Sequence, residues 1–108
     1  MVQKQRMYLR QQAEENLLNT REQVNRDIAK AYRRLKQSEE LIRVAGKAVE
    51  YRKEELKIQS DRRRSGLNLE ADLLSAKAAM SKAEADQYAA QLNYRMALSE
   101  FKILTGTF

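Results

Sequence analysis

The sequence predicts an all-α fold, a long antiparallel coiled-coil helical hairpin with two arms of unequal length. Three observations lead to this prediction. The 108 residues include no Pro and only three Gly, so the chain offers few places to turn. Apolar residues recur every seven positions over most of the length, which is typical of helices that wind around each other. One strong helix-breaking segment, residues 65–68, divides the chain into two parts.

The first arm is predicted to be a single helix over residues 3–64, roughly 90 Å long at the rise of an α-helix. Large aliphatic side chains recur in it every seven residues, at Ile28, Leu35, Ile42, Val49 and Leu56. A companion series, offset by three, consists of Leu17, Val24, Ala31, Ser38 and Ala45. The two series share one face of the helix and form the stripe of a left-handed coiled coil. Arg62–Arg64 should end the helix, because cations are favoured at a helix C-terminus.

Residues 65–68, Ser-Gly-Leu-Asn, are predicted to form the turn between the two arms. Gly66 can adopt the left-handed backbone conformation that ends many helices. Asn68 belongs to the residue types that cap a helix N-terminus. Glu70 and Asp72 then place negative charge in the first turn of the next helix, where the dipole favours it. A turn this short brings the second arm back antiparallel to the first.

The second arm is predicted to be a helix over residues 68–105, roughly 57 Å long and closed by Gly106. The side chains expected to pack against the first arm are Leu69, Leu73, Ala76, Met80, Ala83, Ala90, Tyr94, Ala97 and Phe101. Alanine dominates this seam and lets the two helices approach closely. Further alanines lie beside the seam. They either extend the apolar surface towards other partners or serve as good helix formers.

The unequal arms leave part of the first helix without a partner in the chain. If the helices pair from the turn outward, residues before about Asp27 have nothing opposite them. Leu17, Leu18 and Val24 nevertheless continue the apolar stripe there. We therefore expect another subunit or a further segment to cover them. Because a two-helix hairpin has no enclosed core, we also expect oligomerisation to stabilise it.

The composition excludes most catalytic and metal chemistry. There is no His and no Cys, so no imidazole or thiolate is present for a metal site, a general base or a nucleophile. Adjacent acidic pairs such as Glu39 and Glu40 point about 100° apart on a helix and do not converge on a metal ion. We therefore predict no catalytic residue, no metal, no cofactor and no enzymatic activity. The chain also has no apolar run of the roughly 20 residues that cross a bilayer, and no signal peptide.

The charge distribution is uneven, with a formal net charge of +6 for the whole chain. Residues 1–64 hold 17 basic and 10 acidic residues, whereas residues 65–108 hold 4 and 5. The run Arg62–Arg64 could suggest nucleic acid or anionic lipid as a partner. However, the basic residues of the first helix alternate with Glu, and no aromatic platform accompanies them. We favour a solvated helix face and predict no nucleic-acid partner.

Three segments follow one another in an order that resembles a known family. The segment from Arg62 to Leu74 has an arginine, then Gly66, then Asp72 before two leucines. The alanine heptads that follow end near Tyr94. The chain closes with Leu-Thr-Gly-Thr-Phe over residues 104–108. Together these segments resemble the hairpin tip, the return helix and the exit of one repeat in the TolC-like outer-membrane efflux protein family.

This resemblance implies a specific role. Family members are trimers with a β-barrel in the outer membrane and an α-helical tunnel in the periplasm, and each protomer carries two helical repeats. Residues 1–108 would be a single periplasmic α-helical hairpin from a Gram-negative outer-membrane protein, without its β-strands or signal peptide. The family is a passive conduit for efflux or type I secretion. The resemblance implies that Arg62, Gly66, Leu67 and Asp72 face a periplasmic adaptor protein, which joins the conduit to an inner-membrane transporter.

Two other functions remain open on the sequence alone. The hairpin could belong to a periplasmic adaptor, also called a membrane fusion protein, although adaptor arms are usually equal in length. It could also be a generic structural coiled coil, cytoplasmic or designed, without a role in transport. The four tip residues could then do no more than build a stable turn.

Overall fold

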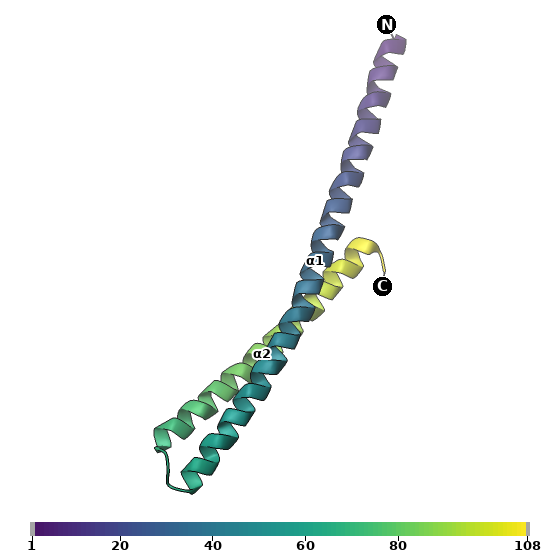
Figure 1. The fold of residues 1–108 in the computed structure, drawn as a ribbon. Helices are drawn as coiled ribbons and strands as arrows, with labels where there is room; N and C mark the ends of the chain where they lie inside the picture. Colours follow the sequence, from purple (N-terminus) through teal and green to yellow (C-terminus); the bar gives the residue numbers. More distant parts are fainter. Residues whose placement is uncertain (1, 108) are drawn as a thin grey trace.

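The computed structural model describes residues 2–107 and contains two helices, α1 (Val2–Arg64) and α2 (Glu70–Thr105). α2 folds back along the C-terminal part of α1, and the molecule measures 95 × 24 × 13 Å (Figure 1). The predicted all-α antiparallel hairpin with unequal arms is confirmed. The helix boundaries fall within two residues of those predicted. Within residues 2–107, neither helix has a segment apolar enough to span a bilayer.

Contacts between the helices define their register. Arg34 of α1 forms an ion pair with Glu100 of α2 at 3.0 Å, and the rings of Tyr32 and Phe101 lie 5.9 Å apart. Antiparallel helices advance equally from these points, so Leu35 lies within two residues of the level of Ala97, and both residues are buried. Further along, the same count brings Val49 within two residues of the level of Ala83. Large aliphatic residues of α1 thus face alanines of α2, which allows the helix axes to lie close together.

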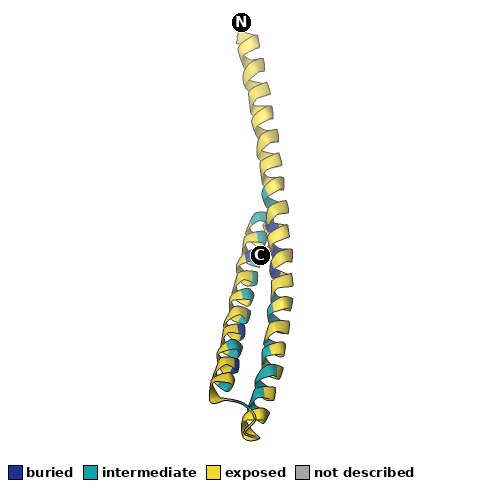
Figure 2. Ribbon diagram, turned by 60° about the vertical axis from the view of Figure 1, so that its left-hand side comes forward, coloured by how far each residue is buried: buried dark blue, intermediate teal, exposed yellow. Residues whose placement is uncertain are grey.

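The seam between the helices contains the least exposed residues of the molecule (Figure 2). The buried residues are Ala31, Leu35 and Ser38 in α1 and Ala76, Ala83 and Ala97 in α2. Half-buried residues of the predicted seam are Ile28, Ile42, Val49, Leu56, Leu73, Met80, Ala90, Tyr94 and Phe101. Ser38 is only 1% exposed, and its hydroxyl donates a hydrogen bond to the carbonyl oxygen of Leu35 at 2.7 Å. This local bond satisfies the hydroxyl inside an otherwise apolar layer.

Leu69 does not belong to the seam, and its assignment there was wrong. Leu69 is 72% exposed, and its backbone is extended, with φ −78° and ψ 150°. It precedes the first helical residue, so the heptad spacing does not determine its direction. The first seam residue of α2 is Leu73, one heptad before Met80.

Both helices end at a glycine in the left-handed conformation, as predicted. Gly66 has φ +70° and Gly106 has φ +71°. After α1, the backbone N–H of Leu67 donates to the carbonyl oxygen of Arg62 at 2.8 Å, and the N–H of Gly66 donates to that of Arg63 at 3.1 Å. These two bonds form a Schellman motif, which satisfies the last carbonyl groups of the helix.

The N-terminal part of α1 extends beyond the end of α2 (Figure 1). Every residue from 2 to 26 is exposed, and half-burial begins at Asp27 and Ile28. Leu17 is 57% exposed and Leu18 is 56% exposed. The expectation that residues before about Asp27 have no partner in this chain is confirmed. We call residues 2–26 the overhang.

Candidate functional site at the hairpin tip

The tip is held in one shape by bonds between the turn and α1. The Schellman motif at Gly66 fixes the path of the chain through Leu67. The side-chain Nδ2 of Asn68 then donates to the main-chain oxygen of Gln59 at 3.1 Å and to its side-chain Oε1 at 2.6 Å. Asn68 therefore ties the turn back to α1 at Gln59, six residues before Ser65.

The prediction that Asn68 caps α2 was wrong. The N-cap residue is Leu69, and no side chain caps the helix there. The backbone N–H of Asp72 donates to the carbonyl oxygen of Leu69 at 3.1 Å, which begins the helical pattern. Asn68 instead donates through its Nδ2 to Gln59, whereas a cap would accept a backbone N–H through its Oδ1. Among residues 2–107, the buried Oδ1 atom of Asn68 has no hydrogen-bond partner, so the tip is less fully satisfied than the seam.

The four residues predicted to face an adaptor come together around one open hollow. Arg62, Gly66, Leu67 and Asp72 line this hollow of about 480 Å³, together with Gln59, Asn68 and Leu69. Leu67 is 77% exposed, so two leucines, Leu67 and Leu69, present apolar side chains at the tip. Sequence reasoning missed Gln59, Asn68 and Leu69 as members of this group. The signal for Gln59 was present, since it occupies a seam position in the heptad count of α1.

The charges at the tip complement the two helix ends. Arg62, Arg63 and Arg64 occupy the last turn of α1, and Glu70 and Asp72 occupy the first turn of α2. The arginines lie at the negative end of the α1 dipole and the carboxylates at the positive end of the α2 dipole, so both groups stabilise their own helix. Within residues 2–107 the ion pairs all lie elsewhere, so Arg62 and Asp72 are not joined to each other. Both side chains remain available to a partner of mixed charge.

The perturbed pKa values lie away from the tip. Glu39 raises the pKa of Lys36, and a hydrogen bond from Arg43 lowers the pKa of Glu40. Glu40 in turn raises the pKa of Arg43. The Lys36–Glu39 and Glu40–Arg43 pairs are exposed and lie three residues apart on α1, the ordinary arrangement for ion pairs on a helix surface. They do not form a cluster in a cleft, which an acid–base site requires.

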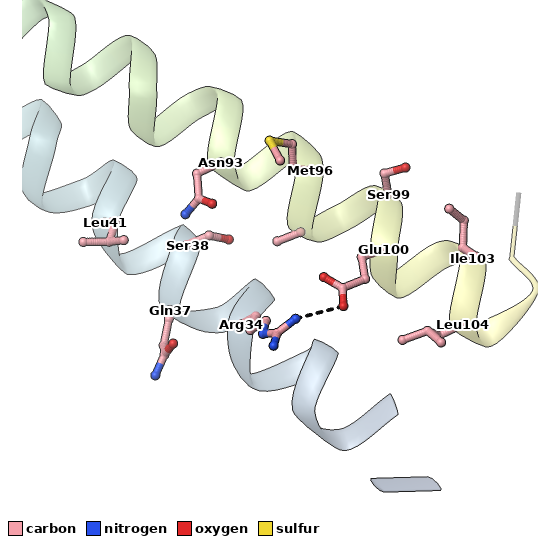
Figure 3. Close-up of a pocket in the computed structure, with 11 residues that line it drawn as sticks. Arg34, Gln37, Ser38, Leu41, Asn93, Met96, Ser99, Glu100, Ile103 and Leu104 are labelled. Carbon is pink, nitrogen blue, oxygen red and sulfur yellow. Dashed lines mark hydrogen bonds and ion pairs between the residues drawn. The ribbon is translucent and has the colours of Figure 1, made fainter. Parts of the chain in front are cut away.

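A second hollow runs along one side of the hairpin, near the end of α2 (Figure 3). It has a volume of about 710 Å³ and receives Arg34 and Leu41 from α1 and Met96, Glu100 and Ile103 from α2. The dashed line in Figure 3 marks the Arg34–Glu100 ion pair between the two helices. Met96 is 64% exposed and Ile103 is 60% exposed, so this side presents apolar surface to solvent. It is a lateral groove between two helices rather than an enclosed ligand site.

Residues 2–107 contain no group of acidic side chains arranged to hold a metal ion. Comparisons with protein-family models, with curated proteins and with solved structures gave no match.

Proposed function

We propose that this hairpin is a structural part of the periplasmic α-helical tunnel of a TolC-like outer-membrane channel protein. It would serve as a passive conduit wall in tripartite efflux or type I secretion and dock a periplasmic adaptor with its tip. The observation that carries the proposal is the grouping of Arg62, Gly66, Leu67 and Asp72 around one hollow. This hollow lies at the end of a rod 95 Å long, where a partner approaching along the rod would meet it first.

Two features of the rod support a role as a wall element. Its overhang carries apolar side chains that are open to solvent, and its lateral groove exposes Leu41, Met96 and Ile103. Exposed apolar surface on more than one side suits a helix pair that has neighbours on more than one side. In the proposed tunnel, other helices of the trimer would cover these surfaces.

The test uses cells that carry the full-length protein, its adaptor and its transporter. Arg62→Ala and Leu67→Asp should each abolish or strongly reduce adaptor-dependent export. The Arg62→Ala substitution removes the positive charge at the hollow. The Leu67→Asp substitution replaces an exposed apolar side chain with a carboxylate. Trimers should still assemble, because neither side chain lies in the seam. Export is measured as drug resistance or secreted protein, and trimers by cross-linking.

Arg64→Ala provides the matched control. Arg64 lies in the same last turn of α1 but does not line the hollow. It should export normally. If Arg62→Ala and Leu67→Asp export as well as the unchanged protein, the tip does not dock an adaptor and the proposal is wrong. Equal loss of export in all three variants would also contradict it, because the effect would then follow from the helix end rather than the hollow.

A further inference from the structure

The overhang continues the seam pattern of α1 but replaces part of it with charges. Counting back in sevens from Ile28 gives Arg21, Glu14 and Met7. Counting back from Ala31 gives Val24, Leu17, Arg10 and Gln3. These positions lie on the face that packs against α2 further along, and in the overhang all of them are exposed. A partner for this stripe must therefore match three charged positions, Arg10, Glu14 and Arg21, as well as apolar ones.

A second copy of the same stripe, running antiparallel, supplies this match in one register. In antiparallel coiled coils each position of one heptad series faces a position of the other series. When Gln3 lies level with Arg21 of the second copy, Met7 faces Leu17 and Arg10 faces Glu14. Because the pair has a twofold axis, each contact occurs twice. Arg10 and Glu14 then meet opposite charges, Arg21 meets the polar Gln3, and the apolar Met7 and Leu17 meet each other.

The neighbouring registers are poorer. A shift of one heptad in one direction brings Arg10 level with Arg21 and places Glu14 against Leu17. The opposite shift places Arg10 against Met7 and Glu14 against Gln3. Like charges in a helix interface and unpaired charges against apolar side chains both disfavour association. Among these antiparallel registers, the charges at positions 10 and 14 therefore favour the one that pairs Arg10 with Glu14.

The flanking positions agree with this register. On one side of the stripe, Arg6 lies near Thr20 of the second copy. On the other side, Lys4 lies near Leu18 of the second copy. Ala13 lies opposite Ala13 of the second copy close to the twofold axis. None of these pairs sets like charges against each other.

We propose that two copies of this chain associate antiparallel through residues 3–21 of α1, with each Arg10 facing Glu14 of the other copy. The two helices overlap over about 28 Å. Two rods of 95 Å joined in this way form a particle about 160 Å long, with a hairpin tip at each end. This inference does not rest on the tunnel proposal, because it concerns residues 1–108 alone, in the absence of the other helices that would cover the overhang in the tunnel.

The test measures the mass of the 108-residue protein by sedimentation equilibrium over a wide concentration range. The unchanged protein should form dimers as the concentration rises. Arg10→Glu and Glu14→Arg should each raise the dimer Kd by roughly tenfold or more, because like charges then face each other at two places. The double variant, Arg10→Glu with Glu14→Arg, restores opposite charges and should dimerise like the unchanged protein.

The most specific experiment mixes the Arg10→Glu variant with the Glu14→Arg variant. A chain with Glu at both positions and a chain with Arg at both positions complement each other in the proposed register. The mixture should therefore form heterodimers, which native mass spectrometry identifies by mass. Glu15→Arg is the matched control, since residue 15 points about 100° away from residue 14 and should leave the Kd unchanged.

Several results would overturn the proposal. One is a protein that stays monomeric at several hundred micromolar. Others are dimers that tolerate Arg10→Glu, a mixture without heterodimers, or a Glu15→Arg variant as weak as Glu14→Arg. Circular dichroism of each variant keeps these results distinct from a loss of helix.

Discussion

Gly66 has a left-handed backbone conformation, whereas Gly46 lies inside a helix. Substitution by alanine should therefore change the free energy of unfolding in opposite directions at the two positions. Gly66 has φ +70°, where an L side chain is strained although nothing lies within 4 Å of an added Cβ. Gly66→Ala should therefore lower the free energy of unfolding by about 1–2 kcal/mol. Gly46 lies within α1, and an added Cβ would meet Gln87 Nε2 at 3.9 Å, an ordinary contact. Gly46→Ala should raise the free energy of unfolding by up to about 1 kcal/mol.

Urea denaturation of both variants, followed by circular dichroism, measures the two changes. Gly66→Asn serves as a control, because asparagine tolerates the left-handed conformation better than alanine does. A Gly66→Ala variant as stable as the unchanged chain would show that the turn relaxes to another backbone conformation.

Asn68 offers a second prediction, which separates its predicted role from its observed one. If Asn68 capped α2, Asn68→Asp would be neutral or stabilising, since Asp is an equally good cap. In the structure, however, its amide donates to two oxygens of Gln59. An ionised carboxylate cannot donate a hydrogen bond and would meet those oxygens with like polarity. Asn68→Asp should therefore destabilise the hairpin by about 1–3 kcal/mol at neutral pH.

The pH dependence of this variant follows from the same contact. The two oxygens of Gln59 should raise the pKa of the introduced carboxyl in the folded chain above the usual Asp value near 3.9. The full loss of stability caused by the carboxylate is present above the raised pKa of the folded state. The loss disappears below the pKa of the unfolded state, where the carboxyl group is protonated in both states. The stability difference from the unchanged chain, measured at each pH, should thus shrink as the pH falls. A difference that is zero at neutral pH would restore the capping role.

The residue scale also shows where sequence reasoning is limited. Gly66 was predictable because only a few residue types tolerate a positive φ, and glycine is foremost among them. Asn68 was not, because an asparagine side chain can either cap the following helix or bond to an earlier segment. The choice depends on how near Gln59 lies in space, which local sequence does not reveal.

At the scale of the helices, the seam alternates large and small side chains across the pair. Ala83 is 6% exposed and lies within two residues of the level of Val49, on the seam side of α2. Ala83→Leu should therefore overpack this layer and cost about 1–3 kcal/mol. Ala85→Leu is the matched control, because Ala85 is exposed on the outer face of α2 and should change stability by no more than about 0.5 kcal/mol.

Combining Ala83→Leu with Val49→Ala exchanges the large and small members of the layer. The double variant should recover part of the stability that each single variant loses, and the two single effects should not add. Strict additivity in urea denaturation would mean that residues 49 and 83 do not face each other across the seam.

The seam could be predicted from the sequence because the seven-residue spacing marks one face of each helix, whatever its partner. Leu69 was placed in it wrongly, since the spacing alone does not say where a helix begins. The register between the helices was beyond sequence reasoning as well. It depends on how many residues the turn uses, and the turn extends through Leu69 rather than ending at Asn68.

At the scale of the whole molecule, the elongated shape follows from having a single turn between two helices in residues 2–107. The position of that turn determines which part of α1 is paired and which part forms the overhang, so the unpaired length was predictable. The identity of whatever covers the overhang was not predictable, because none of residues 27–107 packs on it. The grouping of seven residues at the tip hollow also required the folded structure, since Gln59 and Asp72 approach only when the turn closes.

The uneven pairing should produce uneven local stability, which amide hydrogen exchange can measure. Isolated helices gain little from propensity alone, and their stability comes mainly from packing. At a concentration low enough to keep the chain monomeric, peptides from residues 2–26 should exchange much faster than peptides from residues 35–56, which lie in the seam.

Raising the concentration of the unchanged protein should slow exchange in residues 3–21 without altering residues 35–56, because dimerisation packs only the overhang. The Arg10→Glu variant should lack this slowing. Equal protection along the whole of α1 in the dilute monomer would mean that the overhang is stabilised by something other than packing against a second helix, and both the open stripe and its proposed partner would have to be abandoned.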